Sequence, residues 1–205
     1  YKRRADTYQK LGCIDSSIDD YKTSYTLHAN DYESLFYLGM LYSQKNELEN
    51  AFSFYKKALA INKNDARLHF FIGNLYEDTN DFEEALYHYQ KLMEIDPYDS
   101  NILSIIGKTY HKMGQTEEAI NSFRHALSLN SSDYMTIISL GNVYFSNKDV
   151  NNAIKYYKDA ISLKPDNPTV HHNLAVCYTS INEYEKAIEE YNNYLLVSPD
   201  STDNS

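Results

Sequence analysis

The sequence predicts an all-α fold built as a solenoid of stacked helix pairs. A five-residue motif recurs every 34 residues without a slip, from Leu38–Tyr42 to Leu174–Tyr178, and a fixed period of this length indicates stacked repeats. Within each period, small and apolar residues recur at intervals of three and four, which is the spacing of one helix face. Gly or Asn recurs where a helix would end, and Asp or Asn recurs where the next would begin.

The composition describes a folded and acidic chain. Its 205 residues are 42% hydrophobic and 23% charged, with a net charge of -10, values that fit a globular protein. The charge argues against nucleic acid as the main partner, because phosphate binding needs a basic surface. No apolar stretch approaches the roughly 20 residues that span a bilayer. Cys13 and Cys177 are too far apart in the array to pair, which favours a reducing compartment; we expect the cytoplasm, with the nucleus as the alternative.

We number each repeat from 1 to 34 so that the recurrent Gly stands at position 8. Positions 4, 7, 8 and 11 then form one face of a first helix, and positions 20, 24 and 27 form one face of a second helix. Position 8 is Gly or Ala and position 20 is Ala or Ser, so the two helices can approach closely. Position 11 is always Tyr and position 24 is Tyr or Phe. Burying each such ring contributes about 2–3 kcal/mol.

These columns resemble the tetratricopeptide repeat (TPR) family, whose signature places Leu-Gly, Tyr, Ala, an aromatic residue, Ala and Pro at the same spacing. The resemblance covers nearly the whole chain, to about Pro199. It implies a right-handed α-solenoid of helix-turn-helix TPR units, with about five complete repeats after one partial N-terminal repeat. The departures are local: the usual Trp at position 4 is absent, and the partial repeat carries Arg4, Ser17 and Ser24 at apolar or small positions.

We expect a single TPR array over residues 1–199, followed by a polar tail at 200–205. Its units are predicted at about 1–31, 32–65, 66–99, 100–133, 134–167 and 168–199. Because the first unit begins within a helix and no polar capping helix follows Pro199, the chain is expected to be a piece of a longer protein.

The predicted turns and helix starts follow the same numbering. Position 15 is Gly or Asn in five of six repeats, as expected for a left-handed residue that ends a helix. The exception is Lys148, for which we expect Asn147 to take that role. Asp65, Asp99 and Asn167 are predicted to cap the helices that follow them, the last with Pro at the first helical position.

No catalytic, metal or cofactor site is predicted. The glycines and prolines all serve the repeat geometry, so none remains for a phosphate-binding loop. None of the seven His has metal-ligand spacing, and no nucleophilic triad can be nominated. His69 and His171 stand at position 4 and are expected to be packing residues. The chain is therefore predicted not to be an enzyme.

The resemblance implies that the first helix of each pair lines a concave groove through positions 2, 5, 6, 9, 12 and 13. The apolar residues carried over to these positions are Phe36, Tyr37, Met40, Phe70, Phe71, Ile105, Met135, Ile138 and Phe145. They lie off the packing columns, so we expect an exposed apolar strip for an apolar peptide or an amphipathic helix. Alternatively some of them, Phe71 and Ile105 especially, are buried between adjacent first helices.

Polar residues complete the predicted binding positions: Asn74, Lys108, His111, Lys112, Asn142, His172 and Asn173. Of these, Lys108, His111 and Lys112 form a basic spot that either holds an acidic residue of a ligand or is a solvated helix face. Chaperone-binding TPR proteins hold a C-terminal carboxylate with Lys, Arg and Asn spread over three consecutive units. No run of three units here supplies that set, so a chaperone tail is disfavoured as the partner.

The predicted function is that of a non-catalytic scaffold, which binds a peptide or helical segment of a partner protein in the concave groove. One alternative is a structural arc of a larger TPR superhelix that mediates self-association or complex assembly. Another is the regulatory TPR region of an enzyme whose catalytic domain lies outside this segment.

Overall fold

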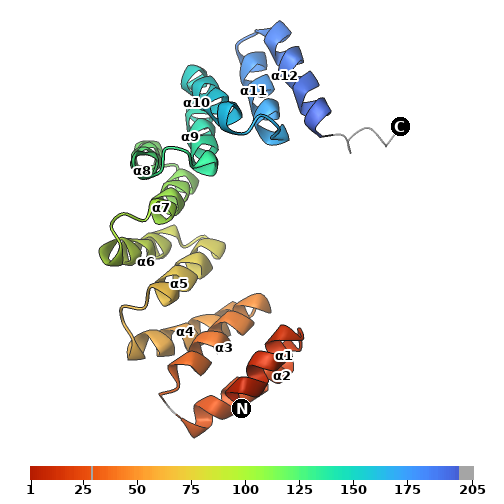
Figure 1. Cartoon of the computed structure of the whole chain (residues 1–205). Helices are drawn as coiled ribbons and strands as arrows, with labels where there is room; N and C mark the ends of the chain where they lie inside the picture. Colours follow the sequence, from red (N-terminus) through yellow and green to blue (C-terminus); the bar gives the residue numbers. More distant parts are fainter. Residues whose placement is uncertain (29, 199–205) are drawn as a thin grey trace. The chain divides into compact units, whose positions relative to one another are not determined.

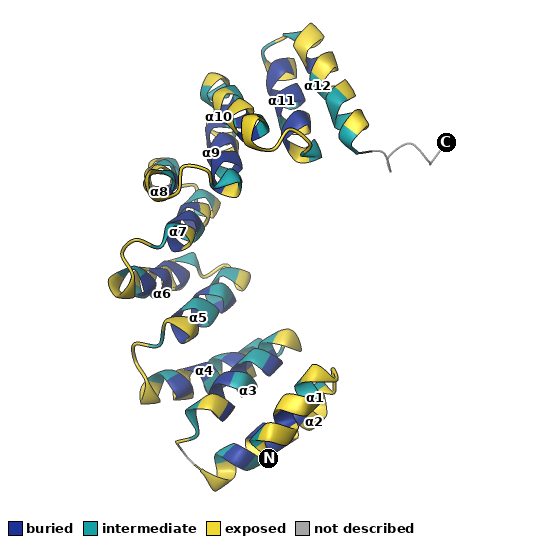
Figure 2. Ribbon diagram, viewed as in Figure 1, coloured by how far each residue is buried: buried dark blue, intermediate teal, exposed yellow. Residues whose placement is uncertain are grey.

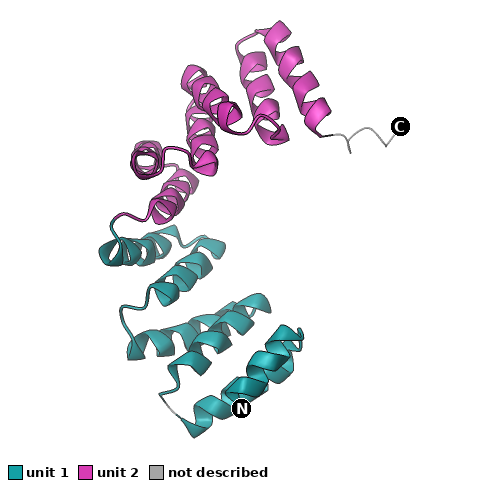
Figure 3. Cartoon of the chain, in the orientation of Figure 1, with its two compact units in different colours: residues 1–97 teal, residues 98–205 magenta. Residues whose placement is uncertain are grey.

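The computed structural model describes residues 1–28 and 30–198. In this part of the chain every regular element is an α-helix, and twelve helices follow one another in consecutive pairs (Figure 1). The predicted all-α fold of paired helices is therefore confirmed. The chain divides into two compact units, residues 1–97 and 98–205 (Figure 3). Pro199 and the predicted tail at 200–205 lie outside the described residues, and the single array over 1–199 stays a prediction.

Unit 1 contains three helix pairs. They are α1 (Lys2–Lys10) with α2 (Ile14–Leu27), α3 (Tyr32–Gln44) with α4 (Leu48–Ile61), and α5 (Ala66–Asp78) with α6 (Phe82–Ile95). Helix α1 has 9 residues, whereas α3 and α5 have 13 each.

Unit 2 also contains three pairs. They are α7 (Ser100–Lys112) with α8 (Thr116–Leu129), α9 (Tyr134–Ser146) with α10 (Val150–Leu163), and α11 (Pro168–Ser180) with α12 (Tyr184–Val197). None of the helices in the described residues is both long and apolar enough to cross a membrane.

The predicted capping residues lie at the start of the first helix of their pairs. The Asp65 carboxylate accepts hydrogen bonds from the backbone N–H groups of Arg67 and Leu68, and Asp99 accepts the equivalent pair at α7. Asn167 caps α11, which begins with Pro168. Each cap satisfies N–H groups that have no partner within the helix, and is worth about 1 kcal/mol.

The turn at the end of α9 corrects one expectation. Lys148 itself adopts the left-handed conformation, with φ of 63°, while Asn147 has φ of -84°. Asn46, Asn80 and Asn182 hold the same conformation at position 15 of their repeats. The regular repeat therefore fixes the left-handed position in the chain, and a Lys placed there must accept its steric cost.

The cores of both units form where a small residue meets an aromatic ring. A Cβ atom added to Gly39 would lie 2.4 Å from Cδ1 of Tyr55, and one added to Gly141 would lie 2.7 Å from Cε1 of Tyr157. Both rings are buried, and the buried faces follow the contacting sides of the helices (Figure 2). Only a residue without a side chain permits this approach.

Successive pairs within a unit are joined through the second helix of one and the first helix of the next. Helix α2 packs on α3 and α4 on α5 in unit 1, and α8 packs on α9 and α10 on α11 in unit 2. The Tyr21 and Tyr37 rings stack at 5.2 Å, and the Phe52 and Tyr76 rings lie 4.7 Å apart. Helices α2, α4, α8 and α10 therefore each present a face that the following helix of the same unit covers.

Candidate peptide-binding surface

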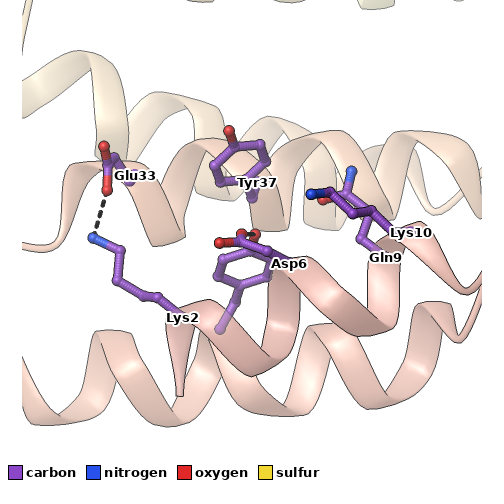
Figure 4. Close-up of a pocket in the computed structure, with 7 residues that line it drawn as sticks. Lys2, Asp6, Gln9, Lys10, Glu33 and Tyr37 are labelled. Atoms are coloured by element: carbon purple, nitrogen blue, oxygen red, sulfur yellow. Dashed lines mark hydrogen bonds and ion pairs between the residues drawn. The ribbon is translucent and has the colours of Figure 1, made fainter.

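We define the first-helix surface of each unit as positions 2, 5, 6, 9, 12 and 13 of its repeats. In unit 1 it is hollowed between α1 and α3 into a cavity of about 570 Å³ (Figure 4). The lining residues are Lys2, Asp6, Gln9, Lys10, Tyr21, Glu33 and Tyr37. All of them except Tyr21 stand at the six positions that the family resemblance selects.

Charge in this cavity is partly neutralised by the chain itself. Lys2 Nζ lies 2.8 Å from Asp31 Oδ1 and 2.6 Å from Glu33 Oε2, and both hydrogen bonds raise the pKa of Lys2. Burial disfavours ionised Asp31, but hydrogen bonds from Lys2 and Ser34 outweigh it and lower the pKa of Asp31 to about 2. Lys10 forms no ion pair with any described residue, so it is the cation left for a ligand.

The floor of the cavity is aromatic. The Tyr37 ring stacks on the buried ring of Tyr21 at 5.2 Å, and the Tyr21 hydroxyl donates a hydrogen bond to Asp6. Burial, and then this bond to a carboxylate, raises the pKa of Tyr21. Packing against the core therefore holds the two rings in place, and Tyr37 is the ring that a ligand in the cavity would contact.

Two residues of the predicted apolar strip are buried. Phe36 is 6% exposed and Ile138 is 7% exposed. The Phe36 ring lies 5.5 Å from the Phe71 ring and 6.2 Å from the Tyr55 ring, and the Arg67 guanidinium lies 4.9 Å from its centroid. The expected exposure of Phe36 and Ile138 is wrong, because side chains at position 5 fill the space beside the adjacent helices of their unit.

Most of the strip is only half-buried. The half-buried residues are Tyr37, Met40, Phe70, Phe71, Ile105 and Phe145. Tyr37, Met40 and Phe71 pack against the core of unit 1, and Phe145 packs against that of unit 2. Met135 differs, since 57% of its surface is exposed. The predicted strip is therefore partly covered: in unit 1 the rings of Phe70 and Phe71 contact each other at 5.8 Å, and Met135 is the one of the nine residues that is largely exposed.

The polar binding positions of unit 2 are more accessible. Lys108 and Lys112 are exposed on α7, and His111 beside them is half-buried. His172 is exposed on α11, with its ring 6.2 Å from that of Tyr191. Unit 2 thus presents charged and hydrogen-bonding groups at the polar positions that the sequence predicts for binding.

Asn142 on α9 and Asn173 on α11 form a side-chain pair. Oδ1 of Asn142 accepts a hydrogen bond from the Tyr157 hydroxyl at 2.6 Å and another from Nδ2 of Asn173 at 3.3 Å. The two N–H groups of Asn142 and the carbonyl oxygen of Asn173 are left for a ligand. The pair therefore presents a donor beside an acceptor, held in place by the buried ring of Tyr157.

The contact between Tyr157 and Asn142 is one case of a rule that sequence reasoning missed. Position 24 lies 15 residues after position 9, and a Tyr at position 24 donates to the side chain at position 9. In unit 1 the hydroxyl of Tyr89 donates to Oδ1 of Asn74 at 2.8 Å. Where position 9 is Lys108, which cannot accept, position 24 is Phe123. The 15-residue spacing between an acceptor at position 9 and a Tyr at position 24 was the sequence signal that could have predicted these hydrogen bonds.

Two tyrosines break this rule: the exposed Tyr191, whose position 9 partner is Val176, and the buried Tyr55. The position 9 partner of Tyr55 is Met40, whose thioether is at best a weak acceptor. The Tyr55 hydroxyl is buried and has no hydrogen-bond partner in the described residues. Burial raises the pKa of Tyr55. An unpartnered buried hydroxyl costs about 1–3 kcal/mol.

Two buried histidines at position 4 have different partners. Nε2 of His69 lies 2.9 Å from the carbonyl oxygen of Lys63, and its Nδ1 lies 2.9 Å from Nδ1 of His88. His171 makes the same kind of carbonyl contact, but its Nδ1 lies 2.7 Å from a carboxylate oxygen of Glu190. Both are buried, as expected of packing residues. The described residues hold no cluster of three or more metal-ligating side chains.

Family models match most of the chain. Models described as tetratricopeptide repeat match residues 32–65, 66–132 and 168–201, and one described as TPR repeat matches residues 141–179. No curated protein matches the chain at a significant level.

Solved structures share the fold at low identity. A tetratricopeptide repeat protein from Parabacteroides merdae is 16% identical, with a TM-score of 0.83, and the match covers 96% of this chain and 82% of that one. MamA is 21% identical, with a TM-score of 0.74 over 85% of this chain and 95% of its own. YrrB, described as a TPR protein with an unusual peptide-binding site, is 22% identical, with a TM-score of 0.67 over 88% and 93%. The repeat columns, the paired helices and these matches together establish that the chain belongs to the tetratricopeptide repeat family.

Proposed function

We propose that this chain is a non-catalytic scaffold that binds an extended peptide segment of a partner protein on the first-helix surface of unit 2. The observation that carries the proposal is the pair of Asn142 and Asn173. Their unused N–H and C=O groups match the C=O and N–H groups of a peptide backbone, which recur in every extended segment whatever its sequence.

The pair is suited to binding because it is fixed before the ligand arrives. The Tyr157 ring is buried against Gly141, and its hydroxyl holds Asn142 in one orientation. A preorganised donor and acceptor lose less conformational entropy on binding than free surface side chains do. Met135 on α9 adds an exposed, adaptable apolar contact in the same unit.

The surrounding charge favours acidic ligand residues. Lys108 and Lys112 are exposed on α7, which contacts α9 within unit 2. An Asp or Glu of the ligand near Lys108 would gain a contact in a chain whose net charge is -10. The partner is therefore proposed to be a peptide with acidic and small apolar residues. That YrrB is described as having a peptide-binding site supports this class of ligand.

Selection from a random twelve-residue peptide display library tests the proposal. Wild-type chain should enrich peptides whose affinity falls at least about tenfold with Asn142→Ala plus Asn173→Ala, because two hydrogen bonds are lost. Asn121→Ala plus Asn151→Ala, on the second helices α8 and α10 of the same unit, should bind them normally. Peptides that bind both double variants equally well, or no enrichment, would remove the support for this site.

Assembly through α12 is a second candidate function, and a separate observation favours it. The α12 residues equivalent to the covered face of α10 are all exposed: Tyr184, Ile188, Tyr191 and Leu195. On α10 the corresponding side chains are buried or half-buried: Val150, Ile154, Tyr157 and Ile161. Contiguous exposed apolar residues usually mark an interaction surface.

Sedimentation at several concentrations tests this second function. Self-association through α12 should be removed by Ile188→Glu and retained in Glu189→Gln on the same helix. A concentration-independent monomer would exclude self-association through this face and leave the peptide-binding proposal untouched.

A further inference from the structure

A cavity of about 430 Å³ opens in unit 1 among α4, the start of α5 and α6. It does not involve the first-helix surface. Its lining residues are Lys56, Leu59, Ala60, Lys63, Asn64, His69, Tyr87, Lys91 and Glu94. It combines three ammonium groups with an apolar wall, which sets it apart from the mixed-charge cavity between α1 and α3.

Two of its cations are uncompensated. Lys91 Nζ lies 2.8 Å from Glu94, so that charge is paired. Neither Lys56 nor Lys63 forms an ion pair within the described residues, although acidic side chains outnumber basic ones by ten in the whole chain. The Lys56 ammonium lies 5.7 Å from the Phe52 ring centroid, which leaves its hydrogen bonds for an anion.

The walls of the cavity are apolar and fixed. Leu59 is half-buried, and the half-exposed Tyr87 ring makes an edge contact with the His88 ring at 5.2 Å. His69 is buried beside them and is held by the Lys63 carbonyl and by His88. The contact between His69 and His88 links α5 to α6, and the contact between His69 and the Lys63 carbonyl links α5 to the turn that follows α4. These contacts hold the backbone around the cavity in place.

A carboxylate suits this cavity better than a phosphate does. A phosphate is held best where backbone N–H groups at a helix start are unoccupied. Here Asp65 already accepts hydrogen bonds from the N–H groups of Arg67 and Leu68 at the start of α5. The lysine ammonium groups that remain pair with carboxylates and phosphates alike, so the occupied helix start is the feature that favours a carboxylate.

We propose that this cavity is a second binding site, which takes an acidic segment of a protein partner. A carboxylate of the segment pairs with Lys56 and Lys63, and a neighbouring apolar side chain lies against Leu59 and Tyr87. The site is independent of the peptide-binding surface of unit 2, so one scaffold can hold two segments at once.

Unit 2 supplies an internal contrast. At the positions between α10 and α12 that correspond to Lys63, Asn64 and Tyr87, the chain has Pro165, Asp166 and Glu189. Two of these three residues are acidic, whereas the position of Lys56 keeps a lysine, Lys158. The cluster of three lysines is therefore not repeated between α10 and α12, where Pro165 and Asn193 stand in place of Lys63 and Lys91.

Nuclear magnetic resonance titration of the whole chain tests the site, using as probe the acetylated and amidated hexapeptide Glu-Asp-Leu-Phe-Glu-Asp. Backbone amide shifts should concentrate at residues 56–64 and 87–91. The Lys56→Glu plus Lys63→Glu variant should weaken binding about tenfold or more, because two attractive contacts become repulsive. The matched variant Lys155→Glu plus Lys158→Glu on α10 carries the same charge change and should bind as wild type does.

Two further probes separate the alternatives. If the site recognises the carboxylates, the neutral peptide Gln-Asn-Leu-Phe-Gln-Asn should bind at least about tenfold more weakly than the acidic peptide does. Equal weakening by both double variants, equal binding of the neutral peptide, shifts confined to other residues, or no shift at millimolar peptide would each overturn the proposal. Inorganic phosphate shifting the same amides more strongly than the acidic peptide would also overturn it.

Discussion

Tyr55 and Tyr157 occupy the same repeat position, but removal of their hydroxyl groups should have opposite effects. Tyr157 donates to Oδ1 of Asn142 at 2.6 Å, whereas the buried hydroxyl of Tyr55 has no partner in the described residues. Tyr157→Phe loses a net hydrogen bond and should lower the free energy of unfolding by about 1 kcal/mol. Tyr55→Phe removes a desolvated, unpartnered group and should raise it by about 1 kcal/mol.

The assay must report on each unit, because arrays of repeats need not unfold in one step. Urea unfolding followed by circular dichroism gives the overall change, with midpoints compared at constant slope. Amide hydrogen exchange in α3–α5 and in α9–α11 then assigns each change to its own repeats. Protection should rise in the first region for Tyr55→Phe and fall in the second for Tyr157→Phe.

A double-mutant cycle sharpens the test. Met40→Asn places at position 9 the acceptor that Asn74 and Asn142 supply in other repeats. Its effect on the free energy of unfolding should therefore be more favourable when Tyr55 is present than in the Tyr55→Phe background. A coupling energy near zero would refute the reasoning. So would a loss of about 1 kcal/mol in Tyr55→Phe itself, since it would mean that this hydroxyl already has a partner.

Three further predictions concern other buried or strained groups. Burial, and then the nearby His69 and Lys56, lower the pKa of His88 to about 4; the unfolded state therefore binds more protons below pH 6.5, and stability should fall by about 1–3 kcal/mol as pH drops from 6.5 to 4. The variant His88→Glu copies the carboxylate that faces His171, and it should reduce this loss of stability, measured by urea unfolding at pH 7 and 4.5. An unchanged loss would show that His88 is not its source. Gly141→Ala should cost about 1–3 kcal/mol by overpacking, and a change below about 0.5 kcal/mol in the urea midpoint would mean that the ring moves freely. Lys148→Asn should raise the thermal midpoint, gaining about 0.5–1 kcal/mol by easing the left-handed strain, whereas a lower midpoint would show that the Lys side chain stabilises the turn.

The fold could be read from the sequence because its determinants are local and repeated. Gly39 and Tyr55 recur with the same spacing in successive repeats, so each instance supported the others. Caps such as Asp65 depend only on the next few residues. The 34-residue period places the left-handed residue at position 15 of every repeat. For Lys148 the amino-acid preference for Asn predicted the neighbouring Asn147 instead, and the period proved to be the better guide.

The binding surface could be predicted only in part. The family resemblance selected positions that line a cavity, since six of the seven residues lining the cavity between α1 and α3 stand there; their role in binding stays a prediction. Exposure could not be predicted, because Phe36 is covered by rings and a guanidinium from other helices. The pair of Asn142 and Asn173 spans 31 residues and depends on the register of two neighbouring first helices. No local pattern in the sequence encodes that register.

The proposed peptide site is tested most directly by the side-chain amide resonances of Asn142 and Asn173 in a titration with a peptide enriched from the display library. We predict that both resonances shift with the same saturation curve, while the side-chain amide of Asn74 in unit 1 stays in place. Saturable binding that leaves both Asn142 and Asn173 unmoved would contradict the account.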